Sequence, residues 1–312
     1  MVNNMYSIET KKLTKKFKDK IAVNGIDLNI KQGELFALLG TNGAGKTTTI
    51  KMLSGLILPT SGSIKILDMD MKKDIFKIKE ILNVSPQETA IAPNLTVKEN
   101  LEFMAGVYQI KDKDKKINEL IKMFKLDEVL NKRSKTLSGG WQRKISIAIS
   151  LINDPKILFL DEPTLGLDVI ARKELWKVIY ELKGKITIIL TTHYMEEAES
   201  ICDRIIILDN GKIIASGTTD ELKKLSNIEE KITVELNSIS NNDIDKLSKF
   251  KQIRNISYKD NLLIITYSKA TDNLGELTSF LKENSISYNK IYSERPSLND
   301  VFLELTGKDL RD

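Results

Sequence analysis

The sequence lacks the features of a secreted or membrane-spanning chain. Its 312 residues include one cysteine, Cys202, so an internal disulfide cannot form, and its apolar neighbours favour a packed thiol over a reactive one. No apolar run approaches the roughly 18 residues that a membrane-spanning helix requires. The first residues are polar and lead into a lysine-rich stretch, without the apolar core of a signal peptide. We therefore expect a soluble, intracellular protein that reaches a membrane only through a partner.

A strong excess of one charge is also missing. The 48 basic and 43 acidic residues leave a net charge of +5, and the lysines are spread along the chain. A nucleic-acid-binding surface needs clustered basic residues, so we expect no nucleic-acid partner. A modest attraction to anionic lipid head groups stays compatible with this charge. With 41% hydrophobic residues, the chain can form the core of one large domain or two ordinary ones.

Short apolar runs alternate with helical patterns over residues 1–226. Strands are expected at 6–9, 21–30, 34–40, 157–160, 186–190, 205–208 and 212–215, with a lysine-rich turn between the first two. Helices are expected at 46–56, within 97–130, and at 141–152, 169–183 and 219–226. This alternation predicts a mostly parallel sheet covered on both faces. Thr96 and Glu99 have the spacing of a capping box, and Asn210-Gly211 is a favoured hairpin turn.

The pattern changes after residue 226. Alternating strand patterns follow at 231–236, 255–259, 262–267 and 287–292, separated by helical stretches at 242–249 and 273–284, and a last helix is expected at 297–306. The order strand, helix, strand, strand, helix, strand predicts a small ferredoxin-like α+β module. We therefore expect two domains, 1–226 and 227–312.

A glycine-rich loop between an apolar run and a helix is the first chemical signal. Its residues are Gly40, Thr41, Asn42, Gly43, Ala44, Gly45, Lys46 and Thr47, with Thr48 next along the helix. They fit the P-loop pattern, in which glycines let backbone N–H groups surround the phosphates of a nucleotide. Lys46 is expected to contact the β- and γ-phosphates, and the hydroxyl of Thr47 to ligate Mg²⁺. A chance match in a glycine-rich turn is the alternative.

Two adjacent carboxylates end the apolar run 157–160. Asp161 is placed where an acid can hold a phosphate-bound metal ion. Glu162 follows directly and is predicted to be the general base that accepts a proton from an attacking water. Taken alone, the pair would equally fit a strand that ends in solvated acids.

A second glycine-containing helix start lies 23 residues before Asp161. Ser138, Gly139 and Gly140 stand at the beginning of the helix expected at 141–152, where backbone N–H groups and the helix dipole favour an anion. One chain needs only one P-loop for its triphosphate. This surface is therefore expected to close on the nucleotide of another copy, the alternative being a turn that only starts a helix.

Residues 137–143, Leu-Ser-Gly-Gly-Trp-Gln-Arg, resemble the signature motif of ATP-binding cassette (ABC) proteins. The resemblance extends over about residues 6–225 and implies a role for four further residues. Phe17 would stack on adenine, Gln87 would reach Mg²⁺ and the attacking water, and Asp168 would lie in the loop that crosses the dimer interface. His193 would contact the γ-phosphate. Trp141 departs from the pattern, since many relatives carry glutamine or another polar or flexible residue there.

Three longer segments resemble ATPase subunits of the ABC-2 exporter group, which includes multidrug or antibiotic-resistance and sodium-efflux exporters. The segments are 162–168, 192–199 and 296–307. In such systems the permease is a separate polypeptide, and residues 227–312 would hold or regulate the dimer. The alternative is that these residues only add stability.

The resemblance and the motifs together predict a P-loop NTPase cassette of the α/β class with a helical subdomain at about 88–152. Two copies would bind ATP and Mg²⁺ head to tail, hydrolyse the ATP, and drive a permease at the cytoplasmic face of the cell membrane. The alternative is a soluble ABC ATPase with a role in translation or repair. Translation ATPases of this type usually carry two cassettes, and repair ATPases carry a long coiled coil where only 91 residues separate Thr47 from Ser138.

Overall fold

The computed structural model describes residues 6–226, 230–268 and 272–307. The chain forms two compact units, Met1–Thr218 and Thr219–Asp312. The boundary predicted between residues 226 and 227 adjoins 227–229, which lie outside the described residues. The structure divides the chain earlier because helix α8 (Thr219–Lys223) packs against α11 (Leu298–Thr306) of the second unit.

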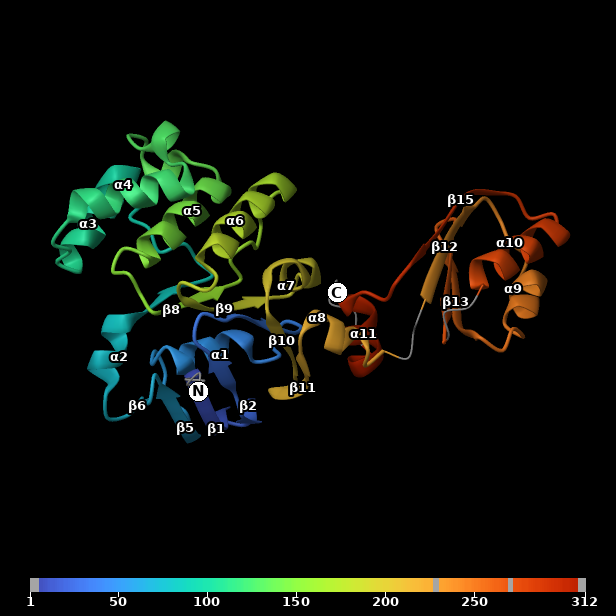
Figure 1. The fold of residues 1–312 in the computed structure, drawn as a ribbon, viewed down its shortest axis with the longest axis horizontal. Helices are drawn as coiled ribbons and strands as arrows, with labels where there is room; N and C mark the ends of the chain where they lie inside the picture. Colours follow the sequence, from blue (N-terminus) through green and yellow to red (C-terminus); the bar gives the residue numbers. More distant parts are fainter. Residues whose placement is uncertain (1–5, 227–229, 269–271, 308–312) are drawn as a thin grey trace. The chain divides into compact units, whose positions relative to one another are not determined.

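A six-stranded sheet forms the centre of the first unit (Figure 1). Its order is β11-β10-β4-β9-β8-β7, and all neighbours run parallel except β11, which pairs antiparallel with β10. The strands are β4 (Leu35–Leu39), β7 (Leu82–Ser85), β8 (Ile157–Asp161), β9 (Thr187–Thr192), β10 (Arg204–Asp209) and β11 (Lys212–Gly217). Every residue of β4, β8 and β9 is buried, as strands covered on both faces require. The predicted mostly parallel sheet is confirmed.

The hairpin between β10 and β11 turns at the predicted dipeptide. Asn210 and Gly211 have φ angles of 48° and 75°, and two positive φ angles are what a two-residue hairpin turn of this type needs. Helices α1 (Lys46–Leu53), α5 (Gly139–Ser150) and α7 (Met195–Ile201) pack on the central sheet. Helix α6 (Val169–Leu182) packs in turn on α5 and α7.

A second, antiparallel sheet precedes and flanks the central one, and here two predictions were wrong. Its strands are β1 (Tyr6–Phe17), β2 (Lys20–Ile26), β3 (Asn29–Lys31), β5 (Ser61–Ile66) and β6 (Met69–Asp70). The lysine-rich stretch predicted as a turn continues β1, because its lysines lie on partly or fully exposed positions of a sheet with one solvated face. The strand predicted at 21–30 is broken at residues 27–28, where Asp27 accepts a hydrogen bond from the backbone N–H of Lys12.

Helices α3 (Val97–Val107) and α4 (Lys113–Phe124) form a helical group with α5. They pack on one another pairwise and lie to one side of the sheets in Figure 1. The predicted capping box is confirmed, since the Thr96 hydroxyl accepts from the Glu99 backbone while the Glu99 carboxylate accepts from the backbone of Thr96. Short helix α2 (Ile75–Ile81) lies before β7.

The second unit contains the ferredoxin-like module. Its elements are β12 (Glu230–Leu236), α9 (Asn241–Leu247), β13 (Ile253–Lys259), β14 (Leu262–Tyr267), α10 (Asn273–Glu283) and β15 (Tyr288–Glu294). The strands pair antiparallel in the order β13-β14-β12-β15, and α9 and α10 cover one face (Figure 1). Ile232, Val234 and Ile265 form the core with Leu247 and Phe280 of those helices. The predicted element order and module are confirmed.

Candidate functional site

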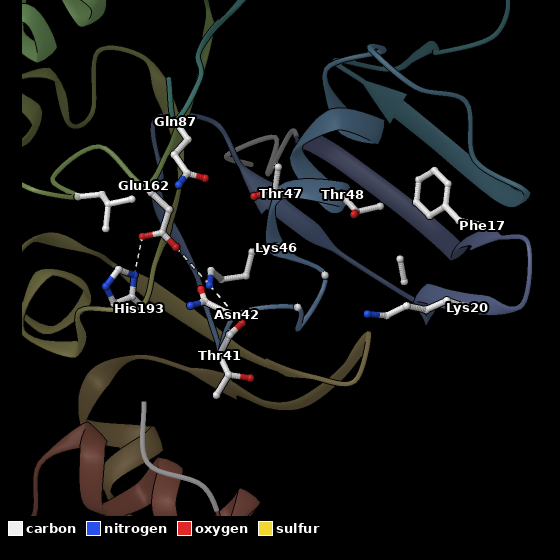
Figure 2. A pocket seen from close by; sticks show the side chains of 14 residues that line it. Phe17, Lys20, Thr41, Asn42, Lys46, Thr47, Thr48, Gln87, Glu162 and His193 are labelled. Atoms are coloured by element: carbon white, nitrogen blue, oxygen red, sulfur yellow. Dashed lines mark hydrogen bonds and ion pairs between the residues drawn. The ribbon is translucent and has the colours of Figure 1, made fainter. Parts of the chain in front are cut away.

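A cavity of about 490 Å³ lies in the first unit where the strands of the central sheet end (Figure 2). Its lining includes most of the predicted site residues: Phe17, Thr41, Asn42, Gly43, Gly45, Lys46, Thr47, Thr48, Gln87, Glu162 and His193. Lys20, Ala22 and Leu165 also line it, and the sequence analysis did not identify them. Thr41, Glu162 and His193 follow β4, β8 and β9 and line one cavity, because parallel strands bring their carboxyl ends to the same edge. The lining residues of β1 and β2 reach the cavity from the antiparallel sheet.

The glycine-rich loop joins β4 to α1 and fits a phosphate group. Gly45 has a φ of 106°, and a Cβ at this position would lie 2.4 Å from the backbone oxygen of Ala22. Only glycine can therefore occupy this position without moving β2. Gly43, with a φ of 81°, has open space beside it. The loop leads directly into α1, whose amino end carries unpaired N–H groups and the positive end of the helix dipole.

Lys46, Glu162 and His193 form a chain of charged and polar contacts in the cavity wall. The Nζ of Lys46 donates to the backbone oxygen of Gly40 at 2.7 Å and lies 3.2 Å from Oε1 of Glu162. The Nδ1 of His193 lies 2.9 Å from Oε2 of Glu162. Figure 2 shows the Glu162 carboxylate between the other two side chains. Any anionic ligand that reaches Lys46 therefore meets a carboxylate already paired with it.

The residues predicted to hold a metal ion also lie together. The Thr47 hydroxyl donates to Oδ1 of Asp161 at 3.1 Å, the Thr191 hydroxyl donates to the same oxygen at 2.6 Å, and Gln87 lines the adjoining cavity. In the part of the chain that the structure describes, no group of three His, Cys, Asp or Glu side chains could hold a metal alone. One carboxylate and one hydroxyl suit Mg²⁺, which commonly takes its other ligands from phosphate and water.

Two buried ionisable residues beside this site were not assigned a role from the sequence. Burial lowers the pKa of Arg143 to about 10, against the opposing influence of Asp161, Glu197 and Glu162. Burial raises the pKa of the Glu197 carboxyl to about 7, against the opposing influence of the Thr192, Trp176 and Thr164 side chains. Both lie in segments that carried the family resemblance, 137–143 and 192–199. Their position within those motifs was the available signal.

Six predicted nucleotide contacts do not line this cavity. Ser138 and Gly139 are exposed at the amino end of α5, and the Cβ of a residue replacing Gly140 would meet only Ala171 and Ser138. Asp168 is exposed and caps α6, accepting from the N–H groups of residues 170 and 171 at 2.9 Å. The other two are the loop residues Gly40 and Ala44, whose backbone oxygens accept hydrogen bonds. Gly40 accepts from the Lys46 ammonium and Ala44 from the backbone N–H of Gly211, so both hold the loop in place.

Phe17 and Trp141 both have a lysine beside the ring. Phe17 is 48% exposed at the end of β1, and Lys15 Nζ lies 5.0 Å from its ring centre. The exposed ring face can accept a flat ligand at the cavity entrance. Lys144 Nζ lies 4.7 Å from the ring centre of Trp141 and 2.6 Å from the carboxylate of Glu174, which fixes the indole against α5.

Comparison with known proteins identifies the family. The model of the ABC transporter family matches residues 23–165, and that of the DrrA1-3-like C-terminal domain matches 217–306. The linearmycin resistance ATP-binding protein LnrL of Bacillus subtilis is 34% identical over 311 residues, which covers 98% of this chain and 100% of that protein. The chain belongs to the ABC transporter ATP-binding proteins. Membership in this family makes the chain an ATP-binding ATPase subunit.

Other relatives match this chain over different shares of its length. The Nod factor export ATP-binding protein I of Bradyrhizobium diazoefficiens is 35% identical over 315 residues, with 99% of both chains covered. The probable multidrug ABC transporter ATP-binding protein YbhF of Escherichia coli is 44% identical over 222 residues, and this chain matches 38% of YbhF's length. The predicted membership in the exporter-type ABC ATPases is confirmed by these relatives and by the DrrA-like domain.

Solved structures confirm the predicted cassette fold. An ATP-binding subunit of an ABC transporter matches with a TM-score of 0.63 and 30% identity, covering 70% of this chain and 92% of that one. The dimeric ATP-binding cassette MJ0796, in a post-hydrolysis state bound to ADP and Pi, matches with a TM-score of 0.62 and 28% identity, over 68% and 98%. Among the described residues, none of the helices is both long and apolar enough to span a bilayer.

Proposed function

We propose that the protein is the ATP-hydrolysing subunit of an ABC exporter and drives a separate membrane permease from the cytoplasmic face of the cell membrane. The observation that carries the proposal is the Lys46–Glu162–His193 chain inside the cavity. It combines a phosphate-binding cation with a carboxylate placed to accept a proton. The outward direction rests on relatives covered over almost their full length, which are named for linearmycin resistance and Nod factor export.

The residues of the cavity divide into groups that would hold ATP. The N–H groups of the loop 40–48 and the ammonium of Lys46 would surround the β- and γ-phosphates. The exposed ring of Phe17 would stack on adenine at the entrance. Thr47, Asp161 and Gln87 would hold Mg²⁺, which when bound would offset the negative charge of the phosphates.

Glu162 and His193 would act on the attacking water. The water oxygen bonds to the γ-phosphorus as the bond from this phosphorus to the bridging oxygen breaks, and the water proton passes to the carboxylate of Glu162. His193 holds that carboxylate through its Nδ1 contact and lines the same cavity, where it would contact a terminal phosphate. A positioned general base contributes about 10²–10⁴-fold in rate.

The second half of each site would come from a second copy of the chain. Ser138 and Gly139 offer an exposed helix amino end that serves no ligand in their own chain's cavity. Leu165, Val169 and Ile170 are 41%, 63% and 73% exposed on either side of Asp168, so an apolar surface accompanies the polar one. A head-to-tail pair would cover both and enclose the nucleotide. The similar cassette MJ0796 is dimeric with ADP and Pi bound, which supports the pairing of two copies.

Replacing Ser138 by arginine is expected to abolish turnover while leaving the affinity of the single chain for ATP nearly unchanged. The large cation would block the approach of the second copy, and Ser138 lies outside its own chain's cavity. Turnover is measured by phosphate release and affinity by a fluorescent ATP analogue. Ser63→Arg, at an exposed position of β5, is the matched control. A large loss of affinity in Ser138→Arg would place Ser138 in its own chain's site.

The exporter role is tested by purifying the tagged full chain from detergent-solubilised membranes and identifying what accompanies it. We expect a stoichiometric protein with several apolar spans of about 20 residues each. Recovery from the cytosol alone, either with ribosomes or without a partner, would contradict the transport role. The ATPase assignment would survive that result and the function would move to the soluble alternative.

A further inference from the structure

Glu162 has an unusual backbone for a residue with a long side chain. Its φ is 48°, in the left-handed region that residues other than glycine rarely adopt. Such a conformation persists only where the surroundings determine it, and it is often found at sites where strain has a role. The N–H of Glu162 donates to the Thr191 hydroxyl at 2.9 Å. Residues 163 and 164, which follow Glu162, are held by contacts with two further side chains, Arg143 and Glu197.

Arg143 holds the backbone on both sides of Glu162. Its Nη2 donates to the backbone oxygen of Asp161 at 2.7 Å, and its Nε donates to that of Pro163 at 2.9 Å. A third donor, Nη1, reaches the backbone oxygen of Gln87 at 3.2 Å. Arg143 is only 4% exposed, so these carbonyl groups take the place of water around its charge. One guanidinium therefore links the signature helix, the Gln87 loop and the segment that carries Glu162.

Glu197 holds the same segment through Thr164, the residue that follows Pro163. Its Oε1 accepts from the Thr164 hydroxyl at 3.1 Å and from Trp176 Nε1 at 2.9 Å. Glu197 is 0% exposed, and its Oε2 has no hydrogen-bond partner among the described residues. The residue lies on α7, directly after the loop of His193. A fully buried acid is costly. Of its two bonded donors, Thr164 lies in the loop from β8 to α6 and Trp176 lies on α6 itself.

We infer that Arg143 and Glu197 form a two-sided clamp on residues 161–164 that keeps the Glu162 carboxylate between Lys46 and His193. Arg143 fixes the carbonyl groups before and after Glu162, and Glu197 fixes Thr164 relative to α7. Both are positioning residues, because neither reaches the cavity. The clamp rests on the proposed hydrolytic role of Glu162 for its effect on turnover. Its effect on the backbone does not depend on that role.

Thr164→Val and Thr164→Ser test the clamp with the full chain. Valine has nearly the shape of threonine but cannot donate to Glu197, whereas serine keeps the hydroxyl. We expect kcat to fall by about tenfold or more in Thr164→Val with KM for ATP within about threefold, since a displaced base affects chemistry more than binding. Thr164→Ser is expected to keep most of kcat. Thr278→Val, which removes a hydroxyl from α10, is the matched control.

Backbone hydrogen exchange gives a readout without ATP. The N–H groups of Leu165 and Leu167 donate to the backbone oxygens of Glu162 and Thr164, at 3.2 Å in each case. We expect these two amides to exchange about tenfold faster or more in Thr164→Val than in Thr164→Ser. Trp176→Phe, which removes the other donor to Glu197, should change exchange in the same direction, and it serves if the valine variant does not fold.

The outcomes separate the two proposals. A wild-type chain that binds ATP without hydrolysing it would refute the proposed function, while faster exchange in Thr164→Val would still support the clamp. Unchanged exchange and unchanged kcat in both Thr164→Val and Trp176→Phe would overturn the clamp. Equal losses in Thr164→Val and Thr164→Ser would also overturn it, because the hydroxyl would then not be the group that matters.

Discussion

Replacing Glu162 by glutamine is expected to lower ATP turnover by about 10²–10⁴-fold, the usual contribution of a general base. The amide has the shape of the carboxylate but cannot take the water proton. ATP affinity is expected to rise at the same time, because the Glu162 carboxylate lies 3.2 Å from Lys46 with side chains only 7% and 6% exposed. In the variant, the phosphate of ATP no longer competes with the Glu162 carboxylate for the Lys46 ammonium. Phosphate release and binding of a fluorescent ATP analogue measure the two effects.

The same variant should also collect as an ATP-bound dimer. Hydrolysis shortens the ligand that bridges two copies, so a chain that binds but does not hydrolyse keeps the bridge. Size-exclusion chromatography with and without ATP detects the change. Glu196→Gln makes the same substitution at an exposed position of α7 and should behave as wild type. A Glu162→Gln variant that turns over at the parent rate would remove Glu162 from the chemistry.

The residues of the P-loop could be predicted because they occupy consecutive positions in the sequence. The segment 40–47 carries its own turn, its own glycines and its own helix start, so local sequence decides the structure. The module after residue 230 was predictable for a related reason. In β12 the apolar residues Ile232, Val234 and Leu236 alternate with polar residues, and the order of elements leaves few topologies.

The first sheet was misread because lysine is ambiguous in a sequence. The exposed lysines of β1 look like a solvated turn, yet they lie on a strand in which Ile8 and Leu13 are fully buried. What decides between the two is the pairing of β1 with β2, β3 and β5. That pairing joins segments up to about 60 positions apart, which a local pattern does not report.

Arg143 and Glu197 escaped the sequence analysis for a different reason. Each acts on backbone or hydroxyl groups of residues 18 to 56 positions away. Every residue has a backbone carbonyl group, so the sequence does not indicate which of them a charged side chain will bind. A role of this kind therefore cannot be assigned from the motif alone. Ser138 is exposed and lies outside its own chain's cavity, and its action on another copy stays a prediction.

Replacing Lys46 by alanine is expected to lower ATP affinity by about 10²–10⁴-fold. Removing one partner of a buried ion pair costs about 3–5 kcal/mol, because the other charge stays buried without compensation. Here the remaining charge is the Glu162 carboxylate, held 2.9 Å from His193 and directed at the space where phosphate would bind. The loss therefore combines a missing attraction with a new repulsion. Equilibrium binding of a fluorescent ATP analogue measures it, and Lys51→Ala, an exposed lysine of the same helix, is the control.

A double variant separates these two contributions. Lys46→Ala with Glu162→Gln removes the cation and the unpaired charge together, so it should bind ATP more tightly than Lys46→Ala alone. The recovered part measures the repulsion by the carboxylate, and the remaining deficit measures what the ammonium contributes to phosphate. Equal affinities of the single and double variants would mean that the carboxylate turns away once Lys46 is gone. In that case the Lys46 contact, rather than the backbone at residues 161–164, would be what aims Glu162 at the cavity.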